Sequence, residues 1–156
     1  MRQPAQLSDA IHILIYIAFI ENPDELTSDV IAASVNTNPA RVRKIMGQLK
    51  KAGLLISTRG KSEPKLAKLL NEISILDVYQ AVNSTQTLLA IDSDVCAQCI
   101  VGESIQEIVE TKFADIQAVA QKRMASITLA EIMDDFIQLS SSRHPNNPEL
   151  YEHMRG

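Results

Sequence analysis

The chain has 156 residues, a formal net charge of −4 at pH 7, 46% hydrophobic residues and 22% charged residues. These values are ordinary for a globular chain that buries its own core, and they exclude disorder throughout. The longest apolar run, Ile11–Ile20, is too short to span a bilayer and the N-terminus lacks a signal-peptide layout, so we expect a cytoplasmic protein.

The first third of the chain predicts three helices. An apolar segment over 10–20 predicts a buried first helix, and a capped, shorter helix is expected over 28–35. Asn38 and Pro39 predict the start of a third helix, which ends at Gly53. Four apolar residues of this helix are spaced i, i+3, i+4, i+7 and form its core face: Val42, Ile45, Met46 and Leu49. The tight turn between the second and third helices indicates a helix-turn-helix.

A small hairpin and a fourth helix follow. Residues 54–58 and 66–70 predict two strands, and the charged segment 59–65 predicts the turn that joins them. A hairpin placed after a helix-turn-helix is typical of a winged helix. Ser74 then predicts the start of a helix over 75–82.

A long helix dominates the second half of the chain. Its pattern runs from Val101 to Met124, about 36 Å at the usual rise of 1.5 Å per residue. The apolar stripe is longer than a small DNA-binding domain would cover, so we expect a second subunit to meet it. The predicted dimerisation residues are Ile105, Ile108, Val109, Phe113, Ile116 and Ala120. Another helix is expected from about Ser126, followed by a polar tail.

These elements predict a mainly α fold: a winged helix-turn-helix DNA-binding domain with a small β-hairpin wing, plus a long dimerisation helix. We divide the chain into the DNA-binding domain (1–82), an irregular cysteine-containing linker (83–100), the dimerisation helices (101–138) and a polar C-terminal tail (139–156).

Positive charge is concentrated in about one fifth of the chain. From Arg41 to Lys68 there are nine Lys or Arg residues and one acid, a net +8, so the rest of the −4 chain carries −12. Because cations neutralise phosphates and the first turn of a recognition helix reads bases, we predict double-stranded DNA as a partner. The candidate DNA-binding residues are Thr37, Asn38, Ala40, Arg41, Arg43, Lys44, Arg59, Lys61 and Lys65. A solvated basic helix and an adaptor that binds an acidic protein are the alternatives.

Patterns typical of enzymes are missing from the sequence. It has no Gly-rich phosphate loop, no nucleophile elbow and no HExxH motif. We therefore predict that the protein is not an enzyme and has no catalytic residues.

Four blocks of the sequence resemble one family of regulators. They are "SDVIAASVNTNPARVRKIMGQLKKAGLLISTRG", "ISILDVYQAV", "CIVGESIQ" and "ASITLAEI", in the family's order between Leu7 and Met133. The chain is similar to the Rrf-two type of winged-helix transcription regulators, which includes the IscR-, NsrR- and CymR-like branches. The resemblance implies a homodimer on a palindromic operator, and we expect a repressor. The wing differs, because Gly60 is followed by "KSEPKLAK" without the further glycines common in the family.

The two cysteines, Cys96 and Cys99, form a CxxC pair. Cluster-binding members of the family present three cysteines, of which Cys99 resembles one, and Asp9 stands where one branch has a non-cysteine ligand. Since an iron–sulfur cluster needs four ligands, we predict no cofactor unless a second subunit supplies more, and zinc meets the same shortage. The pair is then either a redox switch, favoured by a position just before a helix, or an unreactive structural pair.

Overall fold

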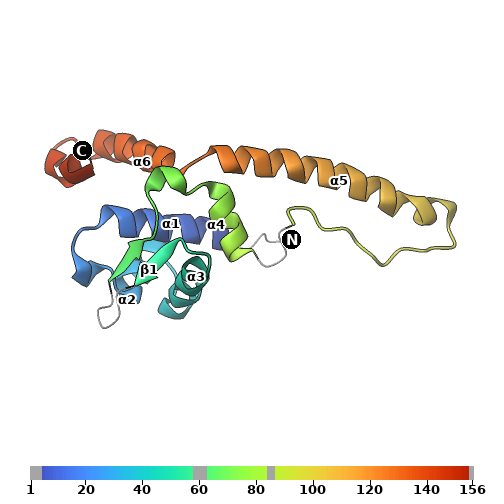
Figure 1. The fold of residues 1–156 in the computed structure, drawn as a ribbon, viewed down its shortest axis with the longest axis horizontal. Helices are drawn as coiled ribbons and strands as arrows, with labels where there is room; N and C mark the ends of the chain where they lie inside the picture. The colour runs from blue at the N-terminus through green and yellow to red at the C-terminus, as the bar shows by residue number, and fades with distance from the viewer. Residues whose placement is uncertain (1–4, 58–62, 84–86, 155–156) are drawn as a thin grey trace.

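The computed structural model describes residues 5–57, 63–83 and 87–154 (Figure 1). In chain order the elements are α1 (Gln6–Phe19), η1 (Pro23–Glu25), α2 (Ser28–Val35), α3 (Pro39–Lys51), β1 (Leu55–Ser57), β2 (Pro64–Leu66), η2 (Leu70–Glu72), α4 (Ile75–Val82), α5 (Ile100–Ser126), α6 (Leu129–Arg143) and η3 (Pro148–Met154). Figure 1 shows α1–α4 and the hairpin gathered into one body, while α5 extends away from it. The predicted fold class, a winged helix-turn-helix with a long additional helix, is confirmed.

The core of the body is built around α1, which contacts α2, α3, α4 and α6. Ile13 and Leu14 of α1 are fully buried, as the apolar run predicted. Leu129 and Met133 of α6 belong to the same core, so α6 closes the body although it follows the long helix in sequence. Helix α1 begins at Gln6, four residues before the predicted start, and its added first turn carries polar contacts to α3 that are described below.

The wing is a two-stranded antiparallel sheet in which Ile56 pairs with Lys65 and Ser57 with Pro64. The predicted second strand over 66–70 is wrong, because β2 ends at Leu66. The alternation of buried Pro64 and exposed Lys65 belongs to a strand, although both residues were predicted to lie in the turn. After β2 the chain turns into η2, where the Glu72 carboxylate accepts a hydrogen bond from the Leu69 amide at 2.9 Å.

The end of α5 returns to the body beside the start of α4. The Ile75 amide donates to the Ile127 carbonyl at 2.9 Å, and the Leu129 amide donates to the Ile73 carbonyl at 2.8 Å. These bonds surround an antiparallel bridge between Ser74 and Thr128. The junction of α5 and α6 is therefore fixed to the body by backbone hydrogen bonds.

The C-terminal segment is ordered against the body. Helix α6 continues to Arg143, beyond the expected start of the polar tail at 139, and η3 follows. Tyr151 of η3 is buried, its hydroxyl lies 2.6 Å from Ser140 Oγ, and its ring lies 6.0 Å from that of Phe19. The polar tail expected over 139–156 did not include these aromatic contacts, which join residues far apart in the sequence.

Candidate nucleic-acid interface

Local side-chain caps form the helix-turn-helix. Thr27 Oγ1 accepts a hydrogen bond from the Val30 amide at 3.4 Å, and Asn38 Oδ1 accepts one from the Arg41 amide at 2.9 Å. Between the helices Asn36 adopts a left-handed conformation, with φ of 58°, that ends α2. Asparagine tolerates this conformation better than most residues, so the turn can be tight. At the far end of α3 Gly53 has φ of 75°, as predicted.

The faces of α3 have different surroundings. Val42, Ile45 and Leu49 are fully buried, which confirms the predicted core face except that Met46 is half-buried. At about 100° per residue, the side opposite this stripe carries Ala40, Lys44 and Lys51, and all three are exposed. This outer face can enter a groove of DNA without disturbing the core.

One flank of α3 is held by α1. Asp9 Oδ2 lies 2.7 Å from Arg41 Nη2 and accepts a hydrogen bond from Arg41 Nε at 2.8 Å. One helical repeat of seven residues further along α3, Gln48 Oε1 accepts a hydrogen bond from Gln6 Nε2 at 2.6 Å. Arg41, expected at the DNA, is thus committed to an ion pair within the chain, although its side chain remains 39% exposed.

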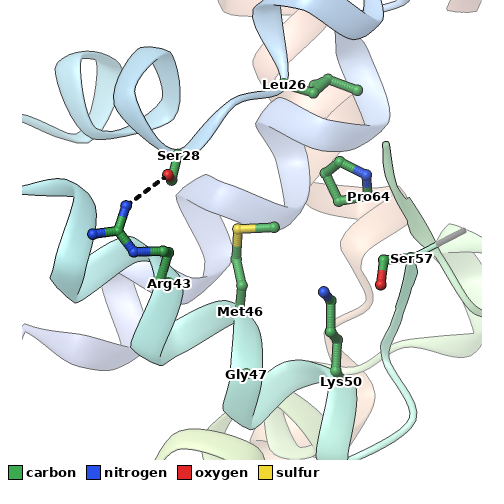
Figure 2. A pocket seen from close by; sticks show the side chains of 8 residues that line it. All are labelled: Leu26, Ser28, Arg43, Met46, Gly47, Lys50, Ser57 and Pro64. Carbon is green, nitrogen blue, oxygen red and sulfur yellow. Dashed lines mark hydrogen bonds between the residues drawn. The ribbon is translucent and has the colours of Figure 1, made fainter. Parts of the chain in front are cut away.

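The other flank of α3 borders an open groove, which we name the wing groove. It has a volume of about 320 Å³ and lies between the start of α2, the flank of α3 and the wing. Arg43 Nη1 donates a hydrogen bond to Ser28 Oγ at 3.1 Å across it. Figure 2 shows Arg43 reaching toward Ser28, with Lys50 rising from α3 between Met46 and Ser57.

The predicted DNA-binding residues differ in their positions. Lys44 is exposed on α3 and Lys65 is exposed on β2, whereas Thr37 is half-buried and Asn38 uses its side-chain oxygen as the cap of α3. Arg59 and Lys61 lie outside the described residues. Lys50 is not among the predicted DNA-binding residues, although its spacing of seven residues from Arg43 could have indicated a shared flank.

Helix α5 carries the predicted dimerisation residues. None of its 27 residues is buried, and the exposed fractions of Ile105, Ile108 and Ile116 are 40%, 55% and 51%. Val109 and Phe113 are half-buried. Part of the other side of α5 is covered by the segment before it, where the Leu88 amide donates to Gln117 Oε1 at 2.9 Å.

Cys96 and Cys99 are exposed at the start of α5. The Cys99 amide donates to the Cys96 carbonyl at 3.2 Å, so the pair spans one tight turn. That carbonyl packs so closely on α5 that any side chain at Gly102 would clash with it. Cys99 Sγ makes no capping hydrogen bond of normal geometry, yet the Gly102 and Val101 backbone N–H groups lower the pKa of its exposed thiol.

The fold and the basic outer face of α3 define a winged helix-turn-helix regulator that binds DNA. Residues 4–135 match the Rrf2 family, described as "Iron-dependent Transcriptional regulator". The chain belongs to this family, which consists of regulators rather than enzymes, in agreement with the predictions from sequence. In the part of the chain that the structure describes, every helix is too short or too polar to form a membrane span.

Relatives and solved structures agree with this membership. YwnA of Bacillus subtilis strain 168, named as an HTH-type transcriptional regulator, is 37% identical over 130 residues that cover 83% of this chain and 96% of YwnA. A crystal structure of a protein described as DNA-binding is 36% identical, with a TM-score of 0.67, and the match covers 82% of this chain and 98% of that one. CymR of B. subtilis, the global cysteine regulator, shares the fold at 17% identity with a TM-score of 0.62, over 86% of this chain and 97% of CymR.

The family description makes iron the cofactor to test against the residues present. Among the described residues, no group of three or more His, Cys, Asp or Glu side chains is placed to hold a metal. Asp9, the one non-cysteine candidate, has its carboxylate engaged by Arg41. With two thiols and one committed carboxylate, the residues of a single chain do not fit an iron–sulfur group that needs four ligands.

Proposed function

We propose that the protein is a cytoplasmic homodimeric repressor that binds a palindromic operator in double-stranded DNA. The proposal is carried by one pairing of features. The outer face of α3 is basic and exposed, and the 27-residue helix α5 has no buried residue. The first provides a DNA contact, and the second needs a partner of matching apolar character.

The DNA contact is assigned to the outer face of α3 and to the wing. Lys44 and Lys51 are exposed on that face. Ala40 lies in the first turn of α3 and Thr37 in the turn just before it, at the end from which recognition helices reach base edges. Lys65 of β2 is assigned to the DNA backbone, and the same assignment is proposed for Arg59 and Lys61, which lie outside the described residues. Arg41 is left out of base readout because Asp9 holds it.

The homodimer follows from the apolar stripe of α5. A soluble chain rarely leaves a row of aliphatic side chains in water, and a second α5 offers the same row in return. Two recognition helices related by a two-fold axis require an operator with matching symmetry. A dimer bound across two successive turns of DNA would exclude polymerase from that stretch, which is the basis for assigning repression.

The test is a selection from random duplexes, followed by a salt titration of the selected fragment. We expect enrichment of a palindrome and a log affinity that falls steeply and linearly with log salt. Lys44→Glu should abolish DNA binding and leave the dimer intact. Lys122→Glu on α5, a matched charge reversal outside the winged helix, should retain DNA binding. A shallow slope without sequence preference would favour the adaptor hypothesis.

We further propose that Cys96 and Cys99 form a reversible disulfide that reports oxidant to the regulator. A turn closed by the Cys99-to-Cys96 hydrogen bond keeps the two Cα atoms within about 7 Å, a separation that largely overlaps the disulfide range. The Cys99 thiolate would attack hydrogen peroxide, breaking its O–O bond to give a sulfenic acid and a hydroxide that takes a proton from solvent to become water. The Cys96 thiol would then displace a second water to form the S–S bond.

The lowered pKa of Cys99 gives this proposal its test. At neutral pH iodoacetamide should alkylate Cys99 faster than Cys96. Only the thiolate reacts, and the lowered pKa of Cys99 gives its thiol a larger thiolate fraction at this pH. Peroxide should remove both thiols in the wild type and change operator affinity. If Cys96→Ser responds to peroxide as the wild type does, the disulfide is not the signal.

A further inference from the structure

The wing groove contains two positive charges that the fold does not neutralise. Arg43 and Lys50 both line it, seven residues apart on one flank of α3. Within the described part of the chain, neither has a carboxylate oxygen within 4 Å, in contrast to Arg41 on the opposite flank. The hydrogen bond to Ser28 fixes the Arg43 guanidinium and leaves other N–H groups of the guanidinium available.

The wall of the groove between these cations is open. Gly47 lies there on α3, and a Cβ built on it would meet no atom within 4 Å. Glycine is unfavourable inside a helix, and its lack of a side chain allows close approach of a ligand to the backbone. The groove thus has room for a bulky group beside both cations.

The remaining residues that line the groove carry no negative charge. Leu26, Met46 and Pro64 supply apolar walls, which strengthen electrostatic attraction by excluding solvent. The acids nearest in sequence, Glu25, Asp29 and Glu63, are not among the residues that line the groove. The N-terminus of α2, at Ser28, adds the partial positive charge of its helix dipole.

We propose that the wing groove binds one phosphate group of the DNA backbone, with Arg43 and Lys50 contacting the same phosphate and Ser28 positioning Arg43. This inference rests on the proposed function and names a subsite within it. It separates phosphate binding on the wing flank from base readout on the outer face. Such a contact would fix the depth and angle at which α3 enters the major groove.

Salt titrations of single and double variants test whether the two cations share a phosphate. Arg43→Ala and Lys50→Ala should each weaken binding to operator and random duplex alike, by about tenfold, and lower the salt slope by about 0.9. The double variant should lower the slope by the same 0.9, because one phosphate is lost in every case. A drop of about 1.8 in the double variant would show two separate phosphates and overturn the proposal.

A DNA fragment with single neutral methylphosphonate positions identifies the phosphate. One position in each half-site should weaken wild-type binding and have no further effect on Lys50→Ala. Gly47→Glu should weaken binding more than the neutral, similarly sized Gly47→Gln, because both side chains fill the groove and only the carboxylate also repels the phosphate. Thermal unfolding of both variants checks that they fold. If Lys50→Ala loses as much affinity as the wild type at every methylphosphonate position, the groove holds no backbone phosphate.

Inorganic phosphate separates a DNA contact from a site for free anions. At constant ionic strength, phosphate should not displace wild-type protein from operator more than chloride does. Displacement by millimolar phosphate that is lost in Lys50→Ala would identify a free-anion site and overturn the DNA assignment. If the wild type binds operator and the groove variants match it in affinity and salt slope, this inference fails while the proposed function stands. If the wild type binds no duplex, both fail.

Discussion

Helices α3 and α5 have similar apolar patterns in the sequence and opposite situations in the structure. The stripe of α3 is satisfied within the chain, since Val42, Ile45 and Leu49 are fully buried. The stripe of α5 is not, and Ile108 and Ile116 remain more than half exposed. The period of a pattern therefore indicates which face of a helix is apolar, but what covers that face depends on where the chain carries the helix.

The largest effect is expected from introducing charge into the stripe of α5. Ile108→Glu combined with Ile116→Glu should separate the dimer and weaken operator binding by at least about 100-fold, because the two half-sites are no longer bound together. Ultracentrifugation and fluorescence anisotropy measure the two effects. Ser104→Glu combined with Thr111→Glu, on exposed positions away from the stripe, should leave both unchanged. A dimer that survives the first pair would refute the role of α5.

A core deletion in α3 should act through folding instead. Leu49→Ala should lower the free energy of unfolding by about 2–5 kcal/mol, the usual cost of a buried cavity. In urea this loss should be the same at every protein concentration, whereas Ile116→Ala should shift the midpoint only where dimers dissociate. A concentration-dependent loss in Leu49→Ala would mean that α3 also meets a second subunit.

The cap of α3 should matter less than its core. Asn38→Ala should cost about 1 kcal/mol of unfolding free energy, because the Arg41 amide loses its acceptor. Asn38→Gly should cost only a few tenths of a kcal/mol, since glycine also caps well. If Asn38→Gly is stable and still loses operator affinity, the side chain contacts DNA in addition to its capping role.

The smallest effect is expected from the link between α1 and α3. Asp9→Asn should change the free energy of unfolding by less than about 1 kcal/mol, because Arg41 is 39% exposed and such pairs are screened by solvent. The change should shrink further at high salt. A larger, salt-independent loss would mean that the Asp9–Arg41 pair orients α3, a role that the exposure of Arg41 does not suggest.

The parts of the fold that were predicted from sequence are those set by neighbouring residues. Thr27, Asn38 and Pro39 act within three positions of themselves, so the bounds of α2 and α3 followed from local chemistry. The register of the wing did not, because Pro64 and Lys65 resemble turn residues until Ser57 and Ile56 are placed opposite them. Pairing between distant segments is not contained in local pattern.

The same limit applied to the candidate interface. The outer face of α3 could be derived from helical period, and Lys44 is exposed there as expected. That Arg41 is engaged by a residue 32 positions earlier, while Arg43 is held by one 15 positions earlier, required the structure. Charge alone could not separate these two arginines, although they are two residues apart.

The backbone junction at Ser74 and Thr128 has a consequence for how the molecule could be rebuilt. The long segment between α4 and α6 leaves the body just after α4 and returns beside the start of α4. The two ends of this segment are therefore close together, separated by one short helix. A short linker could replace this segment without stretching the remaining chain, and the corresponding segments of other family members could be grafted between the same two points. Under the proposed function, such a graft would exchange the dimer contact and the thiol pair while keeping the exposed outer face of α3 that is assigned to DNA.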